Sequence, residues 1–286
     1  MIRIGIYGFT FSKPIKFNGG ELIPIFKSLG LSKKNKVDGK QYVLSGFFLP
    51  EAEDYNGLSQ LIFDLSAVLS FIEQKNVIIS GELEDHESID SLPEDYPKTL
   101  KAHRHLGSGK IIIEDVFYSE SRAKFINLAM VRLNDSVNDE SDAFRTTFFK
   151  SMLKFREPIH YVDVNYYLLF SSLEAIARHS LQKFNPQKTP QIITDFLQGY
   201  GFDVRKNGHV TPQRNIYHYC KLRHALFHNG VYKAWVDDDK KEISLEDYFS
   251  NINRLLPLVF MKILNFDDGC INWDSWMDRQ AFKSPN

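Results

Sequence analysis

The chain has 286 residues, 43% of them hydrophobic and 25% charged, and its formal net charge at pH 7 is −1. This composition excludes a disordered or fibrous chain, and no apolar run approaches the roughly 20 residues of a membrane-spanning helix, so we expect no membrane partner. The nearly neutral charge excludes a protein that attracts nucleic acid over its whole surface, so any such binding must come from a local patch.

Two features bear on localisation. The first residues, MIRIGIYGFTFS, lack the apolar core of a signal peptide. Cys220 and Cys270 are the only cysteines, a number that fits a reducing compartment better than a disulfide framework. We therefore expect a cytoplasmic protein.

Residues 1–119 are expected to form a β-rich α+β domain. Short runs in which apolar and polar residues alternate predict strands at residues 2–9, 41–48, 76–83 and 110–119. A helical repeat of apolar residues predicts a helix at residues 58–75. Residues 81–97 contain seven acidic residues and no Lys or Arg, which is typical of a solvated loop.

Residues 120–286 are expected to form an all-α helical bundle, so the fold class of the whole chain is α+β. The spacing predicts helices at residues 121–134, 142–156 and 164–184, the last after an Asp163 cap. Further helices are expected to begin at Thr189-Pro190 and Thr211-Pro212, where a capping hydroxyl precedes a proline, and after a Ser244 cap. Pro257 is expected to kink the last of them.

The stretch KLRHALFHNG, residues 221–230, is the unusual part of the Thr211 helix, which we expect to end at Asn229-Gly230. On a helical projection Arg223 falls within an apolar arc formed by Ile216, Tyr219, Cys220, Leu226 and Phe227. A charged side chain on a packing face needs a carboxylate, a phosphate or a water-filled cleft.

The charge around this stretch is one-sided. Residues 204–235 contain no Asp or Glu but six Lys or Arg residues and four histidines. Such a segment suits phosphate groups, and Lys221, Arg214 and Tyr217 are its candidate RNA-binding residues. The alternatives are a basic helix packed against the acidic residues 82–95, and a Tyr217 that belongs to the core rather than stacking on a base.

Three roles are open for His224 and His228, which are one helical turn apart. They could bind zinc, although position 225 is alanine where the HExxH motif has glutamate, and no third ligand is indicated. His228 could instead cap the last carbonyls of the helix. The third role is proton transfer, because a helix C-terminus favours a protonated histidine.

These residues resemble a known signature. Arg223, His224, three residues and His228 are similar to the arginine-polar-xxx-histidine motif of the HEPN superfamily. LLFSSLEAIAR, residues 168–178, and YCKLRHALFHNG, residues 219–230, are similar to two motifs of its Apea-like branch. The resemblance covers roughly residues 120–265. In that branch glycine often follows the histidine directly, whereas Asn229 intervenes here.

The resemblance implies a metal-independent endoribonuclease without a cofactor. HEPN enzymes of this type are helical bundles that act as homodimers in phage defence, abortive infection and toxin systems, with two signatures meeting at the interface. Arg223 and His228 would be the catalytic pair and His224 the polar residue beside them. Asn229 and Glu174 would support the site, Glu174 by orienting the Arg223 guanidinium; the alternative for Glu174 is a solvated surface carboxylate.

The chemistry is consistent with this reading, because RNA carries its own nucleophile, the 2′-hydroxyl. Arg223 would hold the scissile phosphate, and a tRNA or other single-stranded or loop RNA would be left with a 2′,3′-cyclic phosphate. Arg223 and His228 are about 140° apart around the helix, so a dimer would aim both at one phosphate more easily than a monomer. Two alternatives stay open: a non-catalytic RNA-binding, nucleotide-binding or dimerisation module, and a nuclease that is silent until residues 1–119 recognise a phage-derived or protein trigger.

Overall fold

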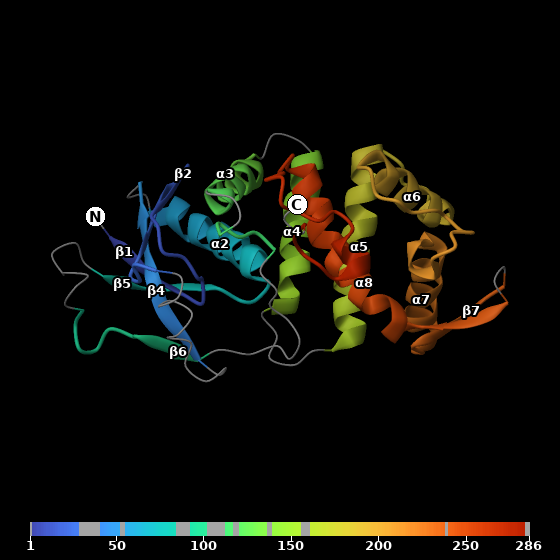
Figure 1. Cartoon of the computed structure of the whole chain (residues 1–286), viewed down its shortest axis with the longest axis horizontal. Helices are drawn as coiled ribbons and strands as arrows, with labels where there is room; N and C mark the ends of the chain where they lie inside the picture. The colour runs from blue at the N-terminus through green and yellow to red at the C-terminus, as the bar shows by residue number, and fades with distance from the viewer. Residues whose placement is uncertain are drawn as a thin grey trace. The chain divides into compact units, whose positions relative to one another are not determined.

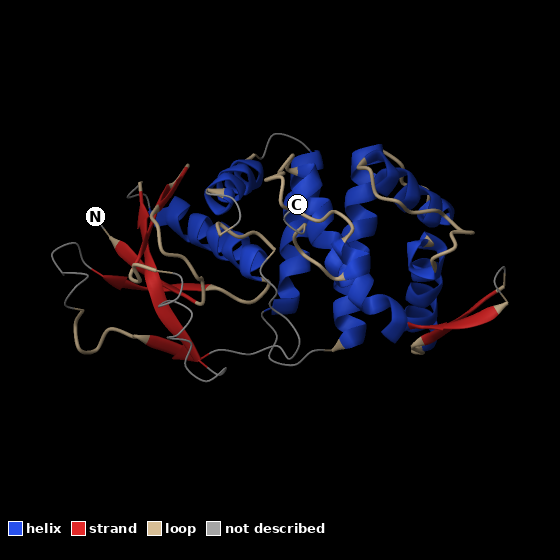
Figure 2. Ribbon diagram, in the orientation of Figure 1, coloured by secondary structure: helices blue, strands red, loops and turns tan. Residues whose placement is uncertain are grey.

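The computed structural model describes residues 2–28, 41–51, 55–83, 92–101, 112–116, 120–135, 139–155, 161–237 and 240–283. Its contacts divide the chain into two compact units, Met1–Asn134 with Phe155–Ile159, and Asp135–Lys154 with His160–Asn286. Figures 1 and 2 show most of the strands in the first unit and most of the helices in the second. The predicted α+β class is confirmed.

An antiparallel sheet forms the frame of the first unit. Its strands are β1 (Arg3–Tyr7), β2 (Ile15–Phe17), β3 (Gly20–Pro24), β4 (Gln41–Pro50), β5 (Ile78–Leu83) and β6 (Thr99–Lys101). The order is β2-β3-β4-β1-β5, and β6 pairs with β4. The strands predicted near β1, β4 and β5 are confirmed, whereas the shorter β2, β3 and β6 were not predicted.

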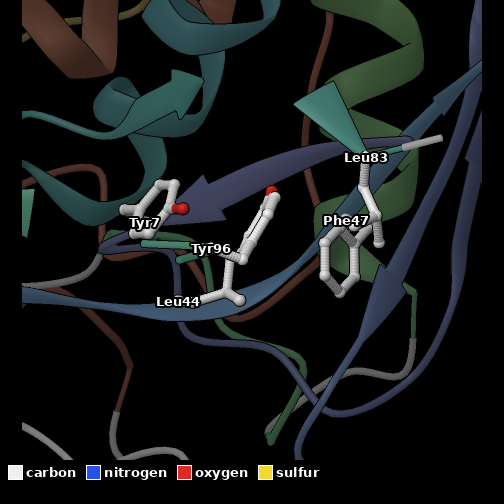
Figure 3. Packing of buried hydrophobic residues seen from close by; sticks show 5 residues of the cluster. All are labelled: Tyr7, Leu44, Phe47, Leu83 and Tyr96. Carbon is white, nitrogen blue, oxygen red and sulfur yellow. The ribbon is translucent and has the colours of Figure 1, made fainter. Parts of the chain in front are cut away.

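Both faces of this sheet are covered. Consecutive strand residues point to opposite faces, and Ile6 and Tyr7 are both fully buried. Tyr7 belongs to a cluster with Leu44, Phe47, Leu83 and Tyr96 (Figure 3). The Tyr96 hydroxyl donates a hydrogen bond to the Gly81 carbonyl at 2.7 Å. The segment that leads into β6 therefore closes one face of the sheet.

Helix α2 (Tyr55–Glu73) confirms the helix predicted at residues 58–75, with an earlier start. It buries Leu65, Val68, Leu69 and Ile72, which share one face at helical spacing. The Ser66 hydroxyl donates to the Val77 carbonyl at 2.6 Å, and the Val77 N–H donates to the Ser70 hydroxyl at 2.8 Å. These bonds fix the end of the helix to the start of β5.

Helix α3 (Ser121–Asn134) has the predicted bounds but belongs to the first unit. The units divide after Asn134, whereas the sequence pattern predicts a division after residue 119. The side chain of Asn127 accepts from the Asn18 N–H at 3.1 Å and donates to the Lys16 carbonyl at 3.2 Å. Since β2 is the first strand in the order of the sheet, α3 covers backbone groups that an edge strand would otherwise expose.

The strand predicted at residues 110–119 is wrong for its described part, residues 112–116, which form bends and turns. Ile113 is fully buried, and the Ile112 N–H donates to the Ile72 carbonyl at the end of α2. The apolar pattern therefore reflects contact with the core and not pairing in the sheet. Residues 110–111 and 117–119 lie outside the described residues.

The second unit is mainly helical. Its helices are α4 (Asp139–Met152), α5 (Val162–Leu181), α6 (Thr189–Gly199), α7 (Ile216–Asn229), α8 (Leu245–Ile263) and α9 (Ser275–Asp278). Helix α5 contacts α4, α6, α7 and α8 and is the central helix of the unit (Figure 1). A hairpin of β7 (Lys233–Val236) and β8 (Lys241–Ser244) adds strands to a half that was expected to be all-α. None of the helices in the described ranges could span a lipid bilayer.

The predicted helix starts had mixed outcomes. The Ser244 cap is confirmed, because its hydroxyl accepts from the Glu246 N–H at 3.3 Å. The Asp163 cap is wrong, since α5 begins after Tyr161 and Asp163 lies in its first turn. Helix α4 begins at Asp139, earlier than predicted, and passes into a short 3₁₀ helix at Leu153–Phe155. Helix α8 continues through Pro257.

Lys154 provides a test of the packing of the second unit. It is buried, its ammonium group donates to the Asn253 side chain at 2.9 Å, and burial lowers its pKa to about 7. Between pH 7 and the ordinary pKa of lysine, the unfolded chain therefore binds this proton more tightly than the folded protein does. The free energy of unfolding should consequently rise by about 2 kcal/mol from pH 7 to pH 9. Lys154→Met should remove this slope and raise the free energy of unfolding at pH 7.

The measurement is urea unfolding at pH 6, 7, 8 and 9, followed by tryptophan fluorescence. All three tryptophans lie at or after residue 235, so this signal reports the second unit alone. Lys183→Met is the control, because that side chain is more than half exposed. Equal pH slopes in the wild type and Lys154→Met would contradict the assignment.

Candidate functional site

Helix α7 carries the arginine and histidine signature. It ends as predicted: Gly230 adopts a left-handed conformation with φ 65°, and its N–H donates to the Leu226 carbonyl. The start differs, because Thr211 precedes only a 3₁₀ turn at Pro212–Arg214 and the α-helix begins after Asn215. The signature thus lies in the second half of a 14-residue helix, and Gly230 follows the last residue of that helix.

The buried face of α7 is not the predicted apolar arc. The helix buries Ile216, His218, Tyr219, Leu222 and Ala225. Phe227 is 43% exposed, and Arg223 is partly exposed rather than enclosed by the arc. The difference arises because α7 turns Leu222 inward, which places Arg223 at the border with solvent.

The signature residues form two neighbouring rows on the exposed side of α7. Arg223 and Phe227 are one turn apart, with the guanidinium carbon 5.8 Å from the ring centroid. His224 and His228 form the adjacent row, and their ring centroids are 4.4 Å apart. We call these four residues the α7 face. His224, His228 and the following Asn229 are exposed, so the face is open to a ligand from solvent.

Glu174 does not hydrogen-bond to Arg223 as predicted. Its carboxylate accepts from Arg178 at 2.7 Å and from the Thr189 hydroxyl at 3.2 Å. The Thr189 hydroxyl, predicted to cap α6, instead donates this hydrogen bond to Glu174 and so joins α6 to α5. Glu174 is neither a direct orienting group for Arg223 nor a fully solvated carboxylate, since its side chain is 21% exposed.

Cys220 shows that these charges nevertheless lie close together. Burial and the negative charge of Glu174 raise the pKa of the Cys220 thiol, while the positive charges of Arg223 and Arg178 act in the opposite direction. These three charged groups therefore act on one sulfur, where α5 contacts α7. Arg223 and Glu174 thus lie near the same thiol, although Glu174 hydrogen-bonds to Arg178.

The other predicted phosphate-binding residues are occupied by acidic partners. Arg214 is buried, and its guanidinium contacts Asp274 at 2.6 Å and Asp203 at 3.1 Å. These contacts fix the loop before α7, so Arg214 is not part of the open α7 face. Lys221 lies 3.3 Å from Asp237, and its interactions with the Tyr217 hydroxyl and that carboxylate raise its pKa.

Tyr217 is partly buried under the Lys221 ammonium group, 5.3 Å from the ring centroid, and is thus neither a core residue nor a free stacking surface. Carboxylates outside the acid-free segment 204–235 therefore offset part of its positive charge. Among the described contacts, Arg214 pairs with Asp203 and Asp274, Lys221 with Asp237, and Lys233 with Glu242. Residues 84–91 lie outside the described residues.

Two residues from other helices join the α7 face and were missed in the sequence. Tyr167 of α5 contacts Phe227, with ring centroids 4.8 Å apart. The Lys150 ammonium group of α4 lies 4.9 Å from the Tyr167 ring centroid. Neither residue belongs to a motif, and only the packing of α4 and α7 against α5 brings them together.

Metal ligation was one of the three roles left open for the histidines. Across the described ranges, His224 and His228 are not joined by a third His, Cys, Asp or Glu in a group able to hold a metal ion. Two rings alone, both exposed, make a poor structural zinc site, because such sites have four ligands.

No protein-family model matches the chain, and searches of curated proteins and of solved structures find no match either.

Proposed function

We propose that this protein is a metal-independent endoribonuclease of the HEPN type, with Arg223 and His228 as catalytic residues. The observation that carries the proposal is the α7 face, on which an arginine and two histidines lie together, open to solvent, at the C-terminal end of one helix. A permanent cation beside titratable imidazoles is the minimum that RNA cleavage by its own 2′-hydroxyl requires.

The proposed reaction forms a bond between the 2′-oxygen and phosphorus while the bond from phosphorus to the 5′-oxygen breaks. The products are a 2′,3′-cyclic phosphate and a 5′-hydroxyl. One histidine takes the proton of the 2′-hydroxyl, and a second, protonated histidine supplies a proton to the leaving oxygen. Arg223 stabilises the negative charge that develops on the phosphorane, and His224 hydrogen-bonds beside it.

A homodimer is part of the proposal. In a two-fold assembly the His228 of each copy can take one of the two proton-transfer roles, while His224 keeps its hydrogen-bonding role beside Arg223. Exposed apolar side chains follow the α7 face directly in the chain: Val231, Tyr232 and Trp235 are each about half exposed. Exposed aromatic and aliphatic groups of this kind are typical of interaction surfaces and support self-association near the site.

The proposed setting is the cytoplasm, where the enzyme acts in phage defence or abortive infection on tRNA or other single-stranded or loop RNA. The division into two units supports a regulated enzyme, because the first unit, which has its own contacts, offers a place for a trigger to bind. Phage-derived or protein ligands of that unit are the proposed triggers.

The test is incubation of wild type and His228→Ala with labelled tRNA and a single-stranded oligonucleotide in EDTA, followed by analysis of product ends. We expect EDTA-resistant cleavage with cyclic-phosphate ends in the wild type only. His209→Ala is the matched control, because His209 lies before α7 and contacts Asp203. If neither wild type nor variant cleaves, also in extracts of phage-infected cells, but both bind RNA, the non-catalytic binding module is correct.

A further inference from the structure

A continuous row of side chains crosses three helices of the second unit. Lys150 of α4 lies against Tyr167 of α5 at 4.9 Å, Tyr167 contacts Phe227 of α7 at 4.8 Å, and Arg223 lies over Phe227 at 5.8 Å. The order is therefore cation, aromatic, aromatic, cation. We call it the cation–aromatic row. It ends at the residue proposed to hold the scissile phosphate.

The two rings of this row are exposed although they could bury each other. Tyr167 is 41% exposed and Phe227 is 43% exposed. Their planes are inclined by 48°, so they do not stack face to face. Each ring therefore retains surface that a second flat, apolar group could cover, and covering it would be favourable.

The cations at the two ends of the row indicate that the group which covers the rings also carries a negative charge. Arg223 is permanently charged, and Lys150 is held against a ring rather than extended into solvent. In the proposed dimer, cations of the two copies lie near one another, which is favourable only with an anion such as an RNA phosphate between them. Unpaired nucleotides supply both missing parts, because each has a flat base and an adjoining phosphate.

We propose that Lys150, Tyr167 and Phe227 form a subsite for single-stranded RNA, in which the nucleotides next to the scissile phosphate stack on the two rings. Lys150 binds a neighbouring phosphate. The subsite rests on the proposed ribonuclease function and defines its substrate: bases already stacked in a duplex cannot reach the rings, so unpaired RNA is bound and paired RNA is not. Tyr167 and Phe227 thus determine specificity, while Arg223 and His228 perform the chemistry.

The subsite is tested by binding, which is independent of cleavage. A fluorescein-labelled single-stranded RNA of 12 nucleotides is titrated by anisotropy into His228→Ala, which does not consume it. Adding Tyr167→Ala or Phe227→Ala is expected to raise Kd about tenfold for each ring, whereas Tyr167→Phe retains the affinity. Lys150→Ala is expected to weaken binding and to reduce the slope of log Kd against log salt by about one.

Matched controls use similar side chains elsewhere on the second unit. Tyr161 is 54% exposed and Phe184 is 56% exposed, so Tyr161→Ala and Phe184→Ala remove comparable rings. Both should leave Kd unchanged, and a hairpin RNA duplex should bind all proteins weakly. Sedimentation of each variant shows whether the oligomeric state is preserved.

The outcomes separate this inference from the proposed function. Wild-type cleavage with no change in Kd or KM for the Tyr167 and Phe227 variants overturns the subsite and leaves the ribonuclease intact. Ring-dependent RNA binding without any cleavage supports the subsite and removes the catalytic proposal. Loss of self-association in the ring variants makes the row a protein contact and overturns the subsite, as does a wild type that binds no RNA.

Discussion

Replacing Arg122 by methionine is expected to lower the stability of the first unit by about 3–5 kcal/mol. Arg122 is only 1% exposed, and its guanidinium lies 3.6 Å from both Glu73 and Glu114. It also donates to the backbone carbonyls of Ile113 and Thr10 and lies over the Phe9 ring. One side chain thus joins α3, the end of α2 and the segments around residues 10 and 113.

The loss is large because the buried carboxylates remain. Burial alone would raise the pKa of Glu73, but Lys75, Arg122 and the Thr10 N–H hold it below its usual value. Without Arg122 the pKa of Glu73 in the folded protein rises. The folded protein then loses part of the stability that ionised Glu73 contributes at a pH above the pKa of a glutamate in the unfolded chain. The deficit should therefore be smaller at pH 4 than at pH 7. Adding Glu73→Gln should recover part of it.

Hydrogen exchange of the β1 and β4 amides measures this effect, because the tryptophans all belong to the second unit. Lys124→Met is the control: it removes an exposed cation from the same helix and should change stability by less than about 0.5 kcal/mol. If Arg122→Met and Lys124→Met exchange alike, the buried ion cluster is not what holds α3 to the sheet.

Under the proposed function, Arg223→Ala is expected to reduce kcat about 10²–10³-fold with little change in stability. The Arg223 guanidinium is partly exposed, and its described ring contact is with Phe227 at the surface. It therefore has no structural role comparable with that of Arg122. Arg223→Lys should restore little, because a lysine offers a point charge in place of a planar fork of donors.

Single-turnover cleavage of labelled RNA measures this loss, and tryptophan fluorescence confirms that the second unit remains folded. Arg205→Ala is the matched control, since Arg205 is exposed in the loop before α7. A catalytic role for Arg223 is contradicted if both variants cleave as fast as the wild type. Equal losses in both would indicate general charge attraction instead of a defined phosphate contact.

The sequence by itself determined the elements whose pattern is local. Helices α2 and α3 follow from apolar spacing, β1, β4 and β5 from alternation, and the end of α7 from Gly230, because only local backbone preference is needed there. The strands β2, β6, β7 and β8 were missed, since three or four residues are too few to show a period. The five-residue strand β3 was missed because its sequence, GELIP, does not alternate.

The arrangement of the site was decided by tertiary structure alone. The motif named Arg223, His224 and His228, and these do share an exposed face, but the same reasoning assigned Glu174 to Arg223 and Arg214 to phosphate. In the fold, Arg178 and Thr189 hold Glu174, and Asp203 and Asp274 hold Arg214.

The physical reason is that a charged side chain takes whichever partner the packing of distant segments brings within about 4 Å, and a sequence does not contain that distance. For the same reason, the sequence could not identify Lys150 and Tyr167 as neighbours of the signature. They stand far from the signature in the chain and carry no motif, yet the contacts of α5 with α4 and α7 place both beside Phe227.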